Sequence, residues 1–364
     1  ETRFYLRYRQ TDNELAGRVT KHAIEHDPRA ANPAYVARDD SREQPGSTFI
    51  GNKTTYYIDD DSSIQTGLAY HDYPMDLREG PNRLKVAYTD VSGTFDYKRR
   101  DTLWGLESQS TAGLRVTRHL PNAGASERVR IPTGNTAGYA PGTPMRNFTY
   151  QGSDTVLHLG NDLEIADDLW LTTGLAAIYT RRESAVTYPQ GGGKTSLSDW
   201  DYAPRLGLRY QLTPELQLFG NLSRSVEAPH PWSLIYSANQ RFPAGSGAAT
   251  GAQRDPIELQ NQTATTLEIG GRGDSTMGQW SLAWYYAQVR HELLSVLPDA
   301  NATTPYELNA SPTVHQGVEA SLSSNLWSRD DGGQLSLRQS YTFSDFHYRD
   351  DDRFGDNRLP GLPM

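Results

Sequence analysis

The fold is decided by residues 199–232, DWDYAPRLGLRYQLTPELQLFGNLSRSVEAPHPW. Apolar and polar residues alternate over residues 205–212, which is the period of a β-strand with one apolar face. A second alternating run starts at Leu216. Between the two runs, Pro214 presets the backbone dihedral angle of a tight turn, so the sequence predicts a hairpin.

The dimensions of this hairpin indicate a membrane environment. Each arm is about ten residues long, and a tilted strand needs roughly 9–11 residues to cross the core of a bilayer. The turn at one end is very short, whereas a long polar segment, residues 227–260, follows at the other end. Short turns on one side and long loops on the other are typical of outer-membrane barrels. We therefore predict an all-β fold, an antiparallel transmembrane β-barrel.

The same pattern recurs along the whole chain, and we expect about twelve strands in hairpins. Outside the central hairpin they are predicted at residues 2–12, 48–58, 63–73, 82–99, 107–119, 154–165, 169–181, 263–272, 279–293, 315–325 and 334–348. The polar stretches between hairpins are predicted to be loops, at residues 13–46, 74–81, 121–152, 182–198, 227–260 and 294–312. No segment shows a convincing helical period.

The composition excludes several classes of protein. The chain contains no run of eighteen apolar residues, which excludes a helical membrane span. Cysteine is absent, so disulfides and thiolate chemistry are excluded. The net charge of −9 argues against a nucleic-acid partner. The chain shows no catalytic motif and no metal-ligand spacing, so we expect no enzyme, no cofactor and no metal site.

Five segments follow one another along the chain: APRLGLRYQLTPELQLFGNLSRSVEAP, TATTLEIGGRG, WSLAWYYAQVRHELL, NASPTVHQGVE and RLPGLP. In this order they resemble the barrel of TonB-dependent outer-membrane receptors. The similarity covers most of residues 50–363 and is strongest from residue 199 onward. Each motif alone is little more than a strand and a turn, but five in the same order are fairly specific.

This resemblance implies a barrel of about 22 strands closed around an N-terminal plug. It also implies active import of a scarce chelate, most often a ferric siderophore, through the bacterial outer membrane, with energy supplied through TonB. The expected partners are the chelate, the TonB complex and outer-membrane lipid. We expect residues 1–364 to be a partial barrel domain, with the plug and its TonB box outside the chain. About twelve strands cannot close such a barrel, so this piece is not expected to be stable in a membrane alone.

A ferric chelate is anionic or rich in oxygen, so its receptor needs Arg and Tyr donors and aromatic walls. The candidate ligand-binding residues lie in two predicted loops and on the central hairpin: His230, Trp232, Tyr236, Arg241 and Phe242; Arg128, Arg130 and Tyr139; and Arg205. We place Trp232, Tyr236 and Arg241 at the centre of the group. Each residue taken singly also fits a solvated loop charge or a packing aromatic, so the prediction concerns the group.

Other readings remain open on the sequence alone. The same type of receptor would take ferric citrate, cobalamin or another small cofactor. A passive porin or adhesion barrel is an alternative, and so is a soluble all-β protein whose apolar faces pack on each other. The alternating row Trp280, Leu282, Trp284 and Tyr286 discriminates between them. In a barrel it points outward as an aromatic girdle, and in a soluble protein it points into a core.

Overall fold

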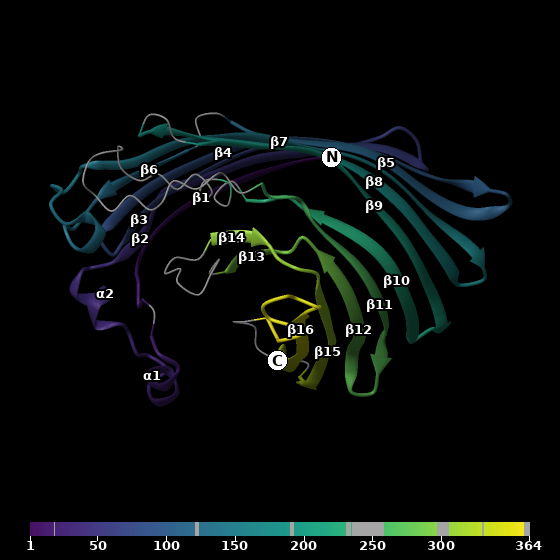
Figure 1. Ribbon diagram of the computed structural model, residues 1–364. Coiled ribbons are helices and arrows are strands. Elements are labelled where there is room, and N and C mark those ends of the chain that lie inside the picture. Colours follow the sequence, from purple (N-terminus) through teal and green to yellow (C-terminus); the bar gives the residue numbers. More distant parts are fainter. Residues whose placement is uncertain are drawn as a thin grey trace.

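A computed structural model describes residues 1–17, 19–120, 124–189, 193–230, 234, 258–296, 306–329 and 331–359. Thirteen strands of this described chain follow one another in a single antiparallel sheet. They are β1 (Thr2–Glu14), β2 (Ser41–Tyr57), β3 (Ser62–Glu79), β4 (Asn82–Leu103), β5 (Leu106–His119), β7 (Pro144–Ala166), β8 (Leu169–Tyr188), β9 (Lys194–Thr213), β10 (Leu216–Glu227), β11 (Gln262–Ser275), β12 (Gly278–Arg290), β15 (Thr313–Ser328) and β16 (Gln334–Tyr348). The sheet curves into a wide arc with β1 and β16 at its two edges (Figure 1).

Tight turns join the strands at one end of the sheet, as the sequence predicts. In the central hairpin, Thr213 of β9 pairs with Leu216 of β10, so only Pro214 and Glu215 form the turn. The β4–β5 turn consists of Trp104 and Gly105, both with positive φ (54° and 82°). Two consecutive positive φ values match the right-handed twist of the flanking strands, and Gly adopts them without strain.

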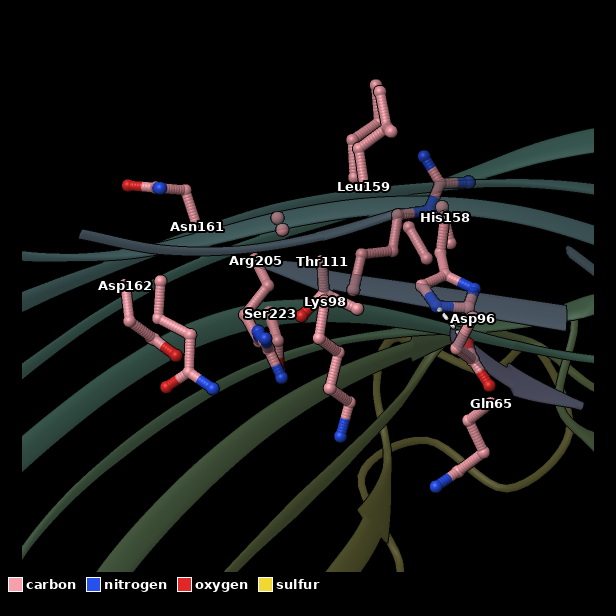
Figure 2. Close-up of a pocket in the computed structure, with 17 residues that line it drawn as sticks. Gln65, Asp96, Lys98, Thr111, His158, Leu159, Asn161, Asp162, Arg205 and Ser223 are labelled. Carbon is pink, nitrogen blue, oxygen red and sulfur yellow. Dashed lines mark ion pairs between the residues drawn. The ribbon is translucent and has the colours of Figure 1, made fainter. Parts of the chain in front are cut away.

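The two faces of the sheet differ in polarity. Figure 2 shows Lys98 and Gln65 extending to the concave side and Leu159 extending to the convex side. Residues that oppose each other in neighbouring strands share a face, as do alternate residues of one strand. The register extends the face of Leu159 across the sheet through Leu175, Pro204, Leu206, Leu222, Leu267 and Tyr286. The convex face is therefore lined by apolar side chains.

The alternating row that distinguishes a barrel from a soluble protein lies on this convex face. It consists of Trp280, Leu282, Trp284 and Tyr286. Leu282 is 50% exposed and Trp284 is 41% exposed, and the Trp284 ring stacks on Tyr286 with centroids 6.4 Å apart. A bilayer covers such a surface, and aromatic rings are favoured at its boundaries. The row points outward, which confirms the barrel prediction, and the described sheet has no second layer packed on its apolar face.

Most predicted loops are shorter than expected, because the strands continue past the apolar band. Residues 74–79 belong to β3, and the hairpin turns only at Gly80 and Pro81, so the predicted loop 74–81 is wrong. Within the predicted loop 121–152, β6 (Gly124–Val129) pairs with β4 and β7. A buried apolar cluster stabilises this extension, consisting of Leu84, Val86, Ala125 and Phe148 with Met75, Leu77, Tyr88 and Val186 packed against it.

Two more predicted loops contain strands. β8 ends at Tyr188 and β9 begins at Lys194, so the predicted loop 182–198 is reduced to the residues between them. In the predicted loop 294–312, β13 (Leu293–Val296) and β14 (Tyr306–Asn309) pair as a separate two-stranded antiparallel sheet. This small sheet lies inside the arc of the main sheet (Figure 1).

The predicted loop 13–46 contains two short helices, which the sequence pattern did not indicate. They are α1 (Lys21–His26) and α2 (Pro33–Ala37). A single 3₁₀ turn, η1 (Gly134–Thr136), lies in another predicted loop, 121–152. The Thr20 side chain caps α1 by accepting from the Ala23 amide, and Asn32 caps α2 by accepting from the Ala34 amide. Helices of five or six residues are too short to show a helical period. None of the described helices is long and apolar enough to cross a membrane.

Candidate functional site: two pockets on the concave face

The first pocket, here called the rim pocket, has a volume of about 690 Å³ and lies at the loop end of the concave face. It is lined by Arg42, His71, Tyr73, Met75, Tyr88, Asp90, His119, Tyr150, Arg182, Glu227, Ala228, Pro229, His230 and Glu307. Most of these residues point inward from β2 to β8, because the sheet curves around them. The pocket lies beyond the lipid-facing band: on β5 and β8 the next outward side chains are Arg118 and Arg181, both exposed.

One wall of the rim pocket is formed by the residues that follow β10. Pro229 is fully buried, and its carbonyl accepts a hydrogen bond from Arg182 Nε at 3.4 Å. The His230 ring packs edge-on against Tyr88, with centroids 5.6 Å apart. The chain after β10 therefore folds back over β4 and β8, which encloses the pocket between this segment and the sheet.

A network of charged groups connects four strands behind the aromatic rings. His119 Nδ1 lies 2.6 Å from Asp90 Oδ1, and His119 Nε2 lies 3.5 Å from Asp154 Oδ2. Arg182 donates to both oxygens of Asp154, at 2.9 and 3.0 Å. Such a bidentate contact fixes the guanidinium in one orientation. The network holds β4, β5, β7 and β8 in register where the apolar band ends.

Two polar atoms of the rim pocket have no partner among the described residues. Tyr150 is only 1% exposed, and its hydroxyl makes no hydrogen bond. The Nε2 atom of His71 is likewise buried without a hydrogen bond. A buried polar group without a partner costs about 1–3 kcal/mol. Water or a ligand group in the pocket would remove that cost.

The environment of the pocket shifts the pKa of three rings. Burial raises the pKa of Tyr150, so its phenol remains protonated and donates. Burial opposes protonation of His119, but the carboxylates of Asp154 and Asp90 outweigh it and raise the pKa of His119 above its usual value. His230 is exposed as a whole residue, but the partial desolvation of its ring, together with the positive charges of Arg182 and His119, lowers the pKa of His230. The pocket therefore contains one histidine that favours protonation and one that resists it.

The second pocket, here called the wall pocket, has a volume of about 500 Å³ and lies on the concave face of β3 to β10 (Figure 2). His158 Nε2 lies 3.1 Å from Asp96 Oδ1, whereas Arg224 is 3.9 Å from Asp201. Lys98 and Arg205 form no hydrogen bond or ion pair with any described residue. Among the described residues, the lining of the wall pocket thus presents two unpaired cations, Lys98 and Arg205, to the lumen.

The structure brings only some of the predicted ligand-binding residues to these pockets. His230 lines the rim pocket and Arg205 lines the wall pocket. Trp232, Tyr236, Arg241 and Phe242 lie outside the described residues.

The other three predicted residues make contacts within the extension of β4, β6 and β7. Arg128 donates to the Gly142 carbonyl at 3.1 Å. Arg130 donates to Asp40 at 2.6 Å. Tyr139 packs against Val129 and Met145. None of the three lines the rim pocket.

Sequence reasoning missed Tyr150, His119, Arg182, Tyr88 and Asp90. Their only sequence signal is alternation: Tyr88 and Asp90, for example, occupy alternate positions of one strand. Their convergence depends on strand register, since His119 and Asp90 are 29 residues apart and Arg182 and Pro229 are 47 apart. In the described part of the chain, no three His, Asp or Glu side chains gather as metal ligands.

Comparison with known proteins identifies the family. Residues 2–364 match the family model described as TonB dependent receptor-like, beta-barrel. Similar solved structures include the ferric citrate transporter FecA (TM-score 0.69, 14% identity, 98% of this chain and 50% of that chain). They also include the ferric yersiniabactin uptake receptor FyuA from Yersinia pestis (TM-score 0.62, 13% identity, 89% of this chain and 46% of that chain). A third is the copper transporter OprC (TM-score 0.58, 15% identity, 89% of this chain and 48% of that chain).

A search of curated proteins gave no match. The chain spans about half the length of the similar solved structures, and at these identities the likeness shows the fold alone. The family match, in contrast, extends over nearly every residue. Members of that family are outer-membrane receptors and transporters rather than enzymes. The chain therefore belongs to the TonB-dependent receptors and forms part of their β-barrel.

Proposed function

We propose that the protein imports a ferric siderophore or a similar iron chelate across the outer membrane, energised through TonB. The observation that carries the proposal is the family match over residues 2–364, on a sheet with an apolar convex face and a polar concave face. Lipid covers the first face, and the second face lines the path of the cargo.

The two pockets offer different binding groups to the cargo along this path. The rim pocket lies at the loop end, where a chelate arrives from outside, and offers aromatic walls with free hydrogen-bond donors. Deeper in the lumen, Lys98 and Arg205 are unpaired cations that attract anionic groups. No cofactor takes part, because the iron is cargo carried by its own chelator.

Uptake by living cells tests the proposal. Iron-starved cells expressing the full-length receptor are given radiolabelled ferric chelates, with TonB present or deleted. TonB-dependent accumulation of at least one iron chelate is expected. Uptake that is indifferent to TonB would instead indicate a passive porin. TonB-dependent uptake of cobalamin or another cofactor, without uptake of any iron chelate, would show that the cargo is not an iron chelate.

A further inference from the structure

Aromatic rings make up much of the lining of the rim pocket. Tyr88 contacts Tyr150 edge-on at 5.9 Å between centroids and His230 at 5.6 Å, and His119 contacts Tyr150 at 5.4 Å. These rings come from β4, β5, β7 and the segment after β10, and they pack against one another as one aromatic cluster in the pocket lining. A planar aromatic group bound among them gains edge-to-face and offset contacts in addition to burial.

The Tyr150 hydroxyl is the best-placed polar group for such a ring. Its side chain is almost fully buried, it lines the pocket, and no described residue accepts from it or donates to it. Because burial raises the pKa of Tyr150, the hydroxyl is a donor at neutral pH. Its natural partner is therefore an acceptor oxygen on the guest, such as a phenol or phenolate oxygen.

The charges of the pocket disfavour a strongly anionic guest. Asp90, Glu227 and Glu307 contribute carboxylates, against the guanidiniums of Arg42 and Arg182 and the ring of His119, which favours protonation. Arg182 is already neutralised by Asp154, and Arg42 donates to the Tyr73 hydroxyl at 3.2 Å. A guest with several negative charges would find no surplus of positive charge here, so the pocket selects against it.

We propose that the rim pocket binds a phenol-bearing iron chelate of low net charge, with its aryl ring among Tyr88, His119, Tyr150 and His230 and its phenolic oxygen accepting from Tyr150. This assignment of a substrate class rests on the proposed function, the import of an iron chelate. It predicts discrimination against ring-free chelates and against highly anionic ones.

Four ferric complexes separate the contributions of aromatic rings and charge. The first is that of a hydroxyphenyl-thiazoline siderophore, which has a ring and low charge. The tris-catecholate complex has aromatic rings and a high negative charge. The citrate complex is anionic and has no aromatic ring, and the trihydroxamate complex has neither an aromatic ring nor a high negative charge. Binding to the purified full-length receptor is followed by quenching of tryptophan fluorescence. The hydroxyphenyl-thiazoline complex is expected to bind at least about tenfold more tightly than the other three.

Tyr150→Phe tests the hydrogen bond without changing the shape of the pocket. We expect it to weaken the hydroxyphenyl-thiazoline complex about tenfold, the size of one hydrogen bond to a charged oxygen. The receptor should not melt at a lower temperature, because the lost hydroxyl has no partner in the protein. Tyr348→Phe is the matched control: Tyr348 is also buried but lies outside the rim pocket, and its loss should leave binding unchanged.

The outcomes distinguish this assignment from the proposed function. Tightest binding of the tris-catecholate, citrate or trihydroxamate would overturn the substrate class, and TonB-dependent uptake of that same complex would leave import intact. Equal affinity of wild type and Tyr150→Phe, or a clear fall in melting temperature, would overturn the role of the hydroxyl. If none of the four complexes is taken up in a TonB-dependent manner, import of iron chelates fails as well.

Discussion

Among single residues, His119 makes the stability of the rim depend on pH. Its pKa in the folded protein is raised above the usual value, so the protonated ring stabilises the fold. That stabilisation is fully present below about pH 6.5 and is lost as the pH rises through the raised pKa. We expect wild type to exceed His119→Gln in melting temperature by more at about pH 6 than at about pH 9. The measurement is thermal unfolding of the full-length receptor in detergent.

A partner variant checks the cause of this pH dependence. His119 faces Asp90 on β4, Asp154 and Tyr150 on β7, Arg182 on β8 and His230 after β10. Asp90→Asn removes the carboxylate closest to the ring and should reduce the pH-dependent advantage. An advantage of the same size at both pH values would show that the ion pairs of His119 do not stabilise the folded state.

Arg130, one of the residues predicted for ligand binding, makes a structural contact in the fold. Its guanidinium donates to the fully buried carboxylate of Asp40 at 2.6 Å, 90 residues away along the chain. We expect Arg130→Gln to loosen the segment before β2 by about 1–3 kcal/mol, because Asp40 loses one of its charged partners while Arg38 remains. Limited proteolysis of that segment measures the effect.

The neighbouring arginine provides a matched control for this test. Arg128 makes one exposed hydrogen bond to a carbonyl, so Arg128→Gln should leave the protease sensitivity unchanged. Equal sensitivity of both variants would show that the contact between Arg130 and Asp40 does not stabilise this segment.

At the scale of elements, the hairpins were predictable because their signals are local. Residues 205–212, Pro214 and the run from Leu216 predict the last part of β9, its turn and β10, whereas the first part of β9, from Lys194, fell in the predicted loop 182–198. The extension of β3, β4, β6 and β7 was not predictable in the same way. Its strands are polar on one face, and its small core joins Leu84 to Phe148 across 64 positions of sequence, a contact that only the fold creates.

The convex face of a single strand gives a direct test of the lipid boundary. Ile269 of β11 is 52% exposed and opposes Trp284, whereas its near neighbour Thr266 lies on the concave face. A Lys on the lipid face costs about 2–4 kcal/mol near the middle of the bilayer. We therefore expect Ile269→Lys to destabilise the full-length receptor in lipid vesicles, measured by urea unfolding.

Thr266→Lys is the control on the same strand, because it places the same charge in the polar lumen. It should leave the unfolding midpoint nearly unchanged. Were the two variants equally stable, the convex face of β11 would not be in contact with lipid.

At the scale of the whole molecule, the open arc limits what this piece of barrel does alone. In the described chain, β1 pairs only with β2, and β16 pairs only with β15. Each edge therefore presents a row of unpaired amide and carbonyl groups. In hydrocarbon each such group costs several kcal/mol, which no apolar side chain of the strand offsets.

We accordingly expect residues 1–364 alone to fail to fold in lipid vesicles, while the full-length receptor folds. The readouts are protection from added protease and the change in gel mobility between heated and unheated samples. Refolding the piece together with the remaining strands as a separate chain should restore both signals, because the added strands pair with the two edges. If residues 1–364 are protected without that partner, the edges must be satisfied in another way, through self-pairing or closure into a smaller barrel.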